Sequence, residues 1–343
     1  MHVKRFGGVG SRMAAFAVVA VLLAVVSACG SSSKSSSGGG GGNSSKLTVG
    51  LITKTDTNPF FVKMKDGAQK AAAKAGVKLM TAAGKFDGDN ASQVTAINNM
   101  ISAGAKGILL VPSDTKAIVP TVQKARKQGI KVITLDTPLE PQSAADALFA
   151  TNNFDAGKLI GEYAKDAMKG KKPVIAMMDL NPGITVGDLR HNGFLSGLGV
   201  PKSSPDIVCT QFTQGDQAKG QAAMETCLQK NPNINLVYSI NEPSGLGAYN
   251  ALQKAGKAKG VVLVSVDGGC TGVQGVKDGK IAATSQQYPL KMASEGVQAI
   301  VDSVRNSKKV SGYHDTGVNL ITAKPMAGVP SKDVQFGLQN CWG

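Results

Sequence analysis

The stretch Val261-Val262-Leu263-Val264-Ser265-Val266-Asp267 decides the fold. It is apolar on both of its faces and ends in an aspartate. A strand of this kind is typical of a parallel sheet that helices cover on both sides. Gly107-Ile108-Leu109-Leu110-Val111-Pro112 has the same character, so the sequence predicts buried parallel strands in both halves of the chain.

Short apolar runs alternate with stretches of helical spacing on either side of these two strands. In the first series, strands are expected at 47–53, 78–82, 107–112, 131–136 and 148–152, and helices at 59–75, 91–103, 115–128 and 155–168. In the second series, strands are expected at 173–179, 207–212, 236–240 and 261–267, and helices at 186–198, 216–230 and 243–255. Two series of strand–helix–strand units predict an α/β fold with two doubly wound parallel-sheet domains.

The beginning of the chain predicts export. An uncharged apolar run over 13–26 follows three basic residues, Lys4, Arg5 and Arg12. That run is shorter than the roughly 20 residues that a membrane-spanning helix needs. It has the length of a signal-peptide core, about 7–15 residues, so we expect the protein outside the cytoplasm.

Val26-Ser27-Ala28-Cys29 ends this run and resembles the bacterial lipobox, in which the cysteine receives lipid and becomes the new N-terminus. Residues 30–45 are almost all serine and glycine, a composition typical of a flexible tether. We therefore predict a lipoprotein signal peptide at 1–28, lipidation of Cys29, a tether at 29–45 and anchoring to the cell membrane, on its extracellular face or in the periplasm. A plain secretory signal with an incidental cysteine is the alternative.

The formal net charge is +15, which raises the question of nucleic-acid binding. The lysines are scattered rather than gathered in a basic run, and aromatic residues make up only 5% of the chain. This pattern is typical of a solvated surface, so we expect no nucleic-acid partner.

Four cysteines remain beyond Cys29, and an even number in an exported protein predicts two disulfides. Three pairings are possible. We favour Cys209–Cys227, which would tie a strand to the following helix, and Cys270–Cys341, which would hold the tail. A metal site is the weaker alternative because the chain has no CxxC pair and only two histidines beyond the signal. We expect neither a metal nor a cofactor.

Polar residues gather where the expected strands end. They are Asp136, Asn152, Asn153, Asp179, Asn181, Asn241, Glu242 and Asp267. In open α/β sheets, ligands bind beyond the carboxyl ends of the strands, although each such residue alone is more often a helix cap. Their repetition in both halves predicts a ligand site where the two rows of strand ends face each other.

Several motifs, taken together in their order and spacing, resemble the ribose-type (type I) periplasmic sugar-binding proteins of ABC importers. They are Val49-Gly50-Leu51-Ile52, Asn58-Pro59-Phe60-Phe61, Arg190 with Gly193-Phe194, Asn241-Glu242 and Val266-Asp267-Gly268. The resemblance covers about residues 46–325. Within it, the stretches 53–58, 84–90, 190–194 and 267–270 and the ending Cys341-Trp342-Gly343 are similar to the fructose-binding branch.

The resemblance implies that the chain crosses between two lobes three times, near Asn152, near Gln287 and at 313–316. It gives an N-terminal lobe of 46–151 plus 288–315 and a C-terminal lobe of 152–287 plus 316–343. A ligand held between the lobes would stabilise a closed form, which the importer then recognises.

The resemblance also implies a set of ligand-binding residues. They are Asn58, Phe60, Phe61, Asp136, Asn152, Asn153, Arg190, Asn241, Asp267 and Gln287. Their chemistry suits a monosaccharide, because aromatic rings cover C–H patches, carboxylates accept hydrogen bonds from hydroxyls, and a guanidinium donates in a planar fork. Phe61 also continues an apolar helix stripe, so a place in the core is the alternative for it.

One departure from the family pattern concerns the choice of sugar. In ribose binders an arginine commonly follows the aspartate, whereas Thr137 follows Asp136 here. We therefore predict fructose rather than ribose, bound by a monomeric substrate-binding lipoprotein that meets the permease subunits of an ABC sugar importer.

Two other functions remain as alternatives. A sugar-sensing receptor that feeds a chemosensor or a signalling kinase would use the same closed form. An enzyme acting on a small sugar is the remote alternative, because the chain lacks GxSxG, GxxxxGK[ST], HExxH and a GxGxxG after a strand. We expect the protein not to be an enzyme.

Overall fold

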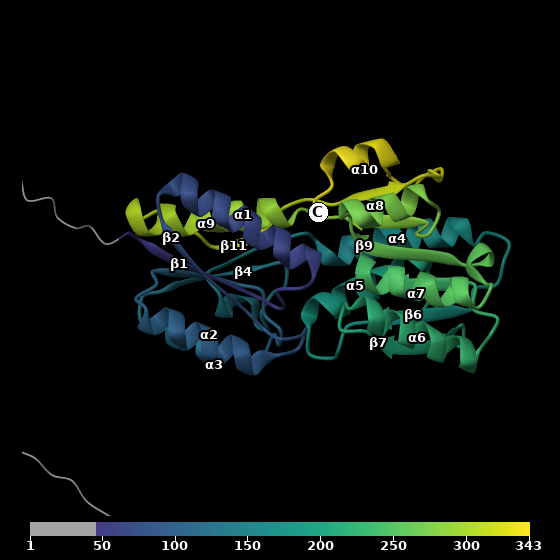
Figure 1. The fold of residues 1–343 in the computed structure, drawn as a ribbon, viewed down its shortest axis with the longest axis horizontal. Coiled ribbons are helices and arrows are strands. Elements are labelled where there is room, and N and C mark those ends of the chain that lie inside the picture. The colour runs from purple at the N-terminus through teal and green to yellow at the C-terminus, as the bar shows by residue number, and fades with distance from the viewer. Residues whose placement is uncertain (1–45) are drawn as a thin grey trace, which may run out of the picture. The chain divides into compact units, whose positions relative to one another are not determined.

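The computed structural model describes residues 46–343. The predicted signal peptide at 1–28, the tether at 29–45 and the lipidation site Cys29 lie outside the described residues. Within 46–343, no helix is both long and apolar enough to cross a membrane. This part of the chain forms two α/β lobes, each built on one six-stranded sheet (Figure 1).

The sheet of the first lobe lies between two pairs of helices (Figure 1). Its strand order is β11-β5-β4-β3-β1-β2, and every neighbouring pair is parallel. The strands are β1 (Thr48–Thr53), β2 (Lys78–Ala83), β3 (Gly107–Leu110), β4 (Lys131–Leu135), β5 (Ala147–Ala150) and β11 (Gly312–Asp315). One face packs against α1 (Pro59–Ala75) and α9 (Pro289–Arg305), and the other against α2 (Asn90–Ser102) and α3 (Val119–Lys127).

The sheet of the second lobe has the order β12-β10-β9-β8-β6-β7, parallel except for the antiparallel edge strand β12. The strands are β6 (Ile175–Asp179), β7 (Ile207–Phe212), β8 (Leu236–Ser239), β9 (Val262–Asp267), β10 (Ala283–Gln286) and β12 (Asn319–Thr322). Helices α4 (Asn153–Ala167) and α5 (Thr185–Leu198) cover one face. The other carries α6 (Gln217–Lys230), α7 (Glu242–Lys254) and α8 (Cys270–Lys277), and α10 (Val334–Asn340) packs on α8 and β12.

The chain passes between the lobes three times. It leaves β5 for α4 at 151–152, leaves β10 for α9 at 287–288 and leaves β11 for β12 at 316–318. The predicted fold class, two doubly wound parallel-sheet domains joined by a three-strand hinge, is therefore confirmed. The third crossing begins where strand β11 ends, because Tyr313 still pairs with β5.

One expected helix is shorter than the pattern indicated. The helix predicted at 115–128 begins at Val119. The Asp114 carboxylate accepts hydrogen bonds from the backbone N–H groups of Lys116 and Ala117, at 2.9 and 2.8 Å, and so holds the preceding residues in a turn. The two predicted series of strands and helices end at residue 267, whereas the structure continues with α8, β10, α9, β11, β12 and α10.

Two disulfides pair the four cysteines. They are Cys209–Cys227 and Cys270–Cys341, the pairing favoured from the sequence. The first ties β7 to α6, and the second ties the first residue of α8 to the residue after α10.

Four glycines allow α4 and α5 to approach each other closely. They are Gly157 and Gly161 on α4 and Gly193 and Gly197 on α5, and a methyl group added at any of them would overlap a backbone carbonyl of the facing helix. For Gly157 that carbonyl belongs to Arg190. The close packing of these two helices therefore fixes the backbone that carries a candidate ligand residue.

Gly157→Ala is expected to lower the free energy of unfolding by about 1–3 kcal/mol, the usual cost of an overpacked interface. Urea unfolding followed by circular dichroism measures the loss. Gly260→Ala is the matched control, because an added methyl group there meets no atom within 4 Å. Equal stability of the two variants would contradict the close packing of α4 on α5.

Candidate ligand-binding site

A small polar chamber lies where the carboxyl ends of the strands of the two lobes face each other. Its lining comprises Lys54, Asn58, Phe60, Phe61, Asp87, Asp136, Leu180, Val186, Arg190, Ile240, Asn241, Asp267 and Gln287. The chamber holds about 30 Å³, which is room for about two water molecules at most.

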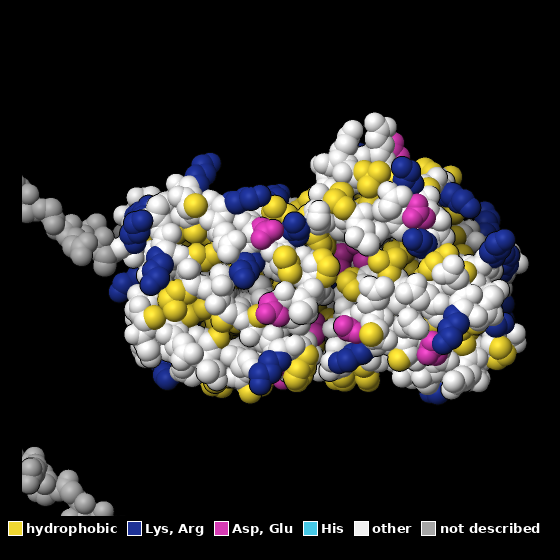
Figure 2. All heavy atoms as spheres, in the orientation of Figure 1, with side chains coloured by type: hydrophobic (Ala, Val, Ile, Leu, Met, Phe, Trp, Pro, Cys, Tyr) yellow, Lys and Arg dark blue, Asp and Glu magenta, His cyan; other side chains and the backbone are white. Residues whose placement is uncertain are grey.

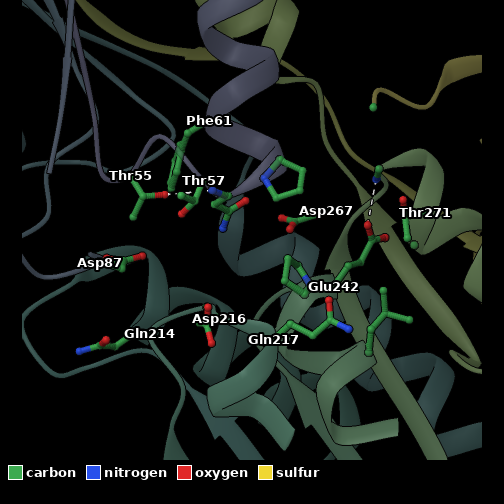
Figure 3. A pocket seen from close by; sticks show the side chains of 18 of the residues that line it. Thr55, Thr57, Phe61, Asp87, Gln214, Asp216, Gln217, Glu242, Asp267 and Thr271 are labelled. Carbon is green, nitrogen blue, oxygen red and sulfur yellow. Dashed lines mark hydrogen bonds between the residues drawn. The ribbon is translucent and has the colours of Figure 1, made fainter. Parts of the chain in front are cut away.

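An open cleft of about 590 Å³ adjoins the chamber and shares part of its lining. In Figure 3, Thr55 and Phe61 of the first lobe lie across this cleft from Gln214 and Gln217 of the second lobe. Figure 2 shows acidic side chains along the line where the lobes meet, while basic side chains spread over the outer surface. The cleft is thus the route from solvent to the chamber.

Arg190 is the centre of the chamber's hydrogen bonds and is only 4% exposed. Its Nε donates to Oδ1 of Asn153 at 2.7 Å, and its Nη1 donates to the backbone carbonyl of Ile240 at 3.0 Å. Its Nη2 lies 3.5 Å from Oδ1 of Asp136, and its Nη1 lies 3.7 Å from Oδ1 of Asp267. One guanidinium therefore links an aspartate of the first lobe to an aspartate of the second.

Asp136 and Asp267 stand directly after β4 and at the end of β9, as the sequence analysis expected. Both are non-glycine residues with positive φ, 61° for Asp136 and 148° for Asp267. Strained backbone of this kind concentrates at functional sites, where the surrounding structure holds it. Oδ2 of Asp136 accepts a hydrogen bond from the Thr137 hydroxyl at 2.8 Å, and Oδ1 of Asp267 accepts one from Nε2 of Gln287 at 2.8 Å.

Glu242 supports the loop after Asp267. Its buried carboxylate accepts hydrogen bonds from the backbone N–H groups of Gly268 and Gly269, at 2.8 and 2.9 Å, and from the hydroxyl of Thr284 at 2.7 Å. Burial raises the pKa of Glu242 to about 8, and the nearby charge of Asp267 adds to the rise. Burial also raises the pKa of Asp267 to about 7, against the opposing charge of Arg190.

Lys54 and Asp87 line the chamber, although neither is among the predicted site residues. Lys54 is 1% exposed, and its Nζ lies 3.7 Å from Oδ1 of Asp87. Burial raises the pKa of Asp87, while the charge of Lys54 acts against the rise. Lys54 follows β1 and Asp87 lies in the loop after β2, so the strand-end rule that selected Asp136 was the signal that pointed to both.

The structure brings most of the expected site residues together but not all of them. Asn152 lies outside the chamber and caps α4, because its side-chain oxygen accepts a hydrogen bond from the backbone of Asp155. Asn153 lies behind Arg190 and also donates to the backbone carbonyl of Asp136 at 3.0 Å. It positions two chamber residues without lining the chamber itself.

Asn58 and Asn241 line the chamber and cap helices at the same time. The side-chain oxygen of Asn58 accepts from the backbone N–H of Phe60 at 3.0 Å, and that of Asn241 accepts from Ser244 at 3.2 Å. Asn241 also donates its amide to the carbonyl of Gly215 at 3.0 Å. What Asn58 offers a ligand is therefore its amide nitrogen.

Phe60 and Phe61 both belong to the core of the first lobe and also line the chamber. Their rings meet edge to face with centroids 5.4 Å apart, and Trp342 meets Phe60 in the same way at 5.4 Å. The core role and the site role of Phe61 are thus compatible. Among residues 46–343, no group of three His, Cys, Asp or Glu side chains could hold a metal ion.

Fold and site together define a class of protein, a two-lobed α/β binding protein with a polar chamber between facing strand ends. A family model described as "Periplasmic binding protein domain" matches residues 49–308. The chain belongs to this family of periplasmic binding proteins, and the resemblance to type I sugar-binding proteins is confirmed.

Named relatives agree with this assignment. The chain is 34% identical to the ribose import binding protein of Salmonella typhimurium over 280 residues, 81% of this chain and 91% of that protein. It is 27% identical to the D-allose-binding periplasmic protein of Escherichia coli, over 76% of this chain and 85% of that protein. A crystal structure of a periplasmic solute-binding protein from Actinobacillus succinogenes with bound D-allose superposes with a TM-score of 0.73 and 26% identity, over 81% and 98% of the two chains.

These relatives are sugar-binding transport proteins, not enzymes, as the sequence analysis predicted. The family works outside the cytoplasm as the binding component of ABC transporters.

The pH dependence of stability tests the raised pKa values of Glu242 and Asp267. Their ordinary pKa values are 4.5 and 3.8, so between those values and about 8 the folded protein holds protons that the unfolded chain has released. Glu242 and Asp267 therefore contribute least to the free energy of unfolding at high pH. The melting temperature of the protein is expected to fall as the pH rises from 5 to 8. The fall should be smaller in Glu242→Gln, and parallel curves for the two proteins would contradict the assignment.

Proposed function

We propose that this protein captures a monosaccharide between its lobes and delivers it to the permease of an ABC importer. The observation that carries the proposal is the bridge that Arg190 forms between Asp136 of the first lobe and Asp267 of the second. Because Arg190 contacts both aspartates, a ligand that bonds to one of them is linked through the guanidinium to the other lobe. Ligand binding and closure of the lobes are therefore coupled.

The chamber supplies what the surface of a sugar requires. Asp87, Asp136 and Asp267 accept hydrogen bonds from hydroxyls, and Lys54 and Arg190 donate to sugar oxygens. Hydrogen bonds to charged groups are worth about 1.5–3 kcal/mol each. Phe60 and Phe61 supply apolar area for the C–H face of the sugar, worth roughly 25 cal/mol per Å² buried.

Fructose is the sugar that we propose. The Thr137 hydroxyl bonds to Asp136 where ribose binders commonly carry an arginine, and the second cation of this chamber comes instead from Lys54. The position after Asp136 therefore offers the ligand no guanidinium here. This rearrangement supports a sugar other than ribose, and similarity of the chain to the fructose-binding branch supports fructose.

Movement of the lobes admits the sugar. The backbone N–H and the hydroxyl of Thr115 in the first lobe both donate to the carbonyl of Gly183 in the second, at 3.1 Å each. A chamber of about 30 Å³ has to widen before a monosaccharide enters, and rotation about the three crossings provides this. The closed, loaded form is then what the permease recognises. If the protein instead serves as a sugar-sensing receptor, the chemosensor or signalling kinase that it feeds would recognise the same form.

The lobes would comprise residues 46–151 plus 288–315 and residues 152–287 plus 316–343, and the protein would act as a monomer.

We also propose that Cys29 carries lipid and that the segment 29–45 tethers the lobes to the membrane. The support is the uncharged run before Cys29 and the serine and glycine after it. A membrane anchor keeps the loaded protein close to the permease.

Calorimetry against a panel of monosaccharides tests the proposal. Fructose is expected to bind at submillimolar concentration or tighter, and Asp267→Ala is expected to abolish binding because it removes the acceptor that Gln287 and Arg190 hold in place. Asp302→Ala is the matched control, since Asp302 pairs with Lys308 on the outer surface. If no sugar of the panel gave a heat of binding, the proposal that the ligand is a monosaccharide would be wrong.

Membrane fractionation tests the anchor. In a bacterial host that receives a labelled fatty acid, the unaltered protein is expected to carry the label and to sediment with membranes. Cys29→Ser should carry no label and should appear in the soluble extracytoplasmic fraction. Labelled Cys29→Ser protein would place the lipid elsewhere.

A further inference from the structure

The last residues of the chain return to the boundary between the lobes. The family model ends at residue 308, so the tail lies beyond the part of the chain that it matches. Helix α10 packs on α8, and the C-terminus lies between α1 and α8 in Figure 1. The Cys270–Cys341 disulfide ties this end of the chain to the first residue of α8.

Trp342 is the only tryptophan of the chain, and it is buried with 7% of its surface exposed. The backbone of this residue joins the second lobe. The N–H of Cys270 donates to the carbonyl of Trp342 at 2.9 Å, and Gly269 and Trp342 form a parallel bridge. Together with the neighbouring disulfide, these bonds fix the direction of the indole.

The indole itself contacts the hinge and the first lobe. Its Nε1–H donates to the backbone carbonyl of Gln287 at 2.8 Å, at the second crossing between the lobes. Its ring meets the ring of Phe60 edge to face in the first turn of α1. A single side chain at the end of the sequence therefore joins both lobes and one hinge segment.

Both partners of the indole are walls of the ligand chamber. Phe60 lines the chamber, and Gln287 lines it with the amide that donates to Asp267. Edge-to-face aromatic pairs have a preferred geometry, so a displaced indole removes one of the two aromatic contacts that orient the Phe60 ring. The same displacement releases the carbonyl of Gln287 from its donor.

We propose that Trp342 is a positioning residue of the chamber and that the Cys270–Cys341 disulfide holds it in place. Trp342 lines the open cleft but not the chamber, and it acts on the chamber through Phe60 and Gln287, whose arrangement it fixes for the ligand. The inference rests on the proposed function for the identity of the ligand, a monosaccharide. The positioning itself is measurable in the ligand-free protein.

The experiment compares Cys270→Ser/Cys341→Ser with Cys209→Ser/Cys227→Ser, which removes the disulfide between β7 and α6. In the first variant only, hydrogen exchange of the ligand-free protein is expected to quicken in the first turn of α1 relative to α2. The amides to follow are those of Phe61 and Val62, which donate to the carbonyl of Asn58. The dissociation constant for the sugar should rise about tenfold, equivalent to about 1.4 kcal/mol.

Two substitutions at the tryptophan separate positioning from general stability. Trp342→Ala is expected to weaken sugar binding as much as loss of the disulfide does. Trp342→Phe keeps a ring against Phe60 and should recover most of the affinity. A merely structural tail would lower the melting temperature in both variants and leave the affinity unchanged.

Unchanged exchange in α1 after loss of Cys270–Cys341 would overturn the inference. So would equal effects of the two disulfide removals, because these would indicate loosening of the whole fold. If the unaltered protein bound no sugar of the panel, the proposed function would fail. The exchange measurement on the ligand-free protein would then decide the positioning role alone.

Discussion

The buried guanidinium of Arg190 is the constraint on which the rest of the structure depends. A buried charge is expensive unless it is paired and hydrogen-bonded, and Arg190 meets this requirement only when Asn153, Asp136 and Asp267 are all in place. These partners come from both lobes, so the requirement extends across the hinge. The glycine contact between α4 and α5 holds the arginine's backbone, and the two aspartates, both at positive φ, place their carboxylates beside the guanidinium.

The fold could be predicted from the sequence more fully than the ligand site. Runs such as 107–112 and 261–267 are apolar on both faces, which is typical of a parallel sheet covered by helices. The carboxyl ends of such strands then locate the ligand site, and Asp136 and Asp267 lie there. The rule says which edge a residue occupies but not where its side chain points. Asn152 follows a strand but caps α4, and Asn153 lies behind Arg190 rather than in the chamber lining. Lys54 and Asp87 also follow strands and do line the chamber, although they are not among the predicted site residues.

Trp342 shows a second limit of sequence reasoning. Its contact with Phe60 joins residues from opposite ends of the folded chain, and no local pattern encodes such a contact. The pairing of Cys270 with Cys341 indicates that the tail returns to α8. It does not specify which side chain next to Cys341 lies between the two lobes. The direction of the indole follows from the backbone bridge to Gly269 and from the carbonyl of Gln287, which only the assembled structure provides.

The polar groups that the closed chamber leaves incompletely bonded indicate how a ligand would favour closure. Among the described residues, Oε1 of Gln287 is buried without a hydrogen-bond partner, and Oδ1 of Asp87 has only the ion pair with Lys54 at 3.7 Å. Such groups cost about 1–3 kcal/mol each where neither water nor a ligand bonds to them, a penalty that an open, hydrated form would avoid. A sugar hydroxyl that donates to either oxygen removes the penalty only in the closed form. This is the differential contact that a shift of the open–closed equilibrium requires, and it arises from acceptors of both the first lobe and the hinge.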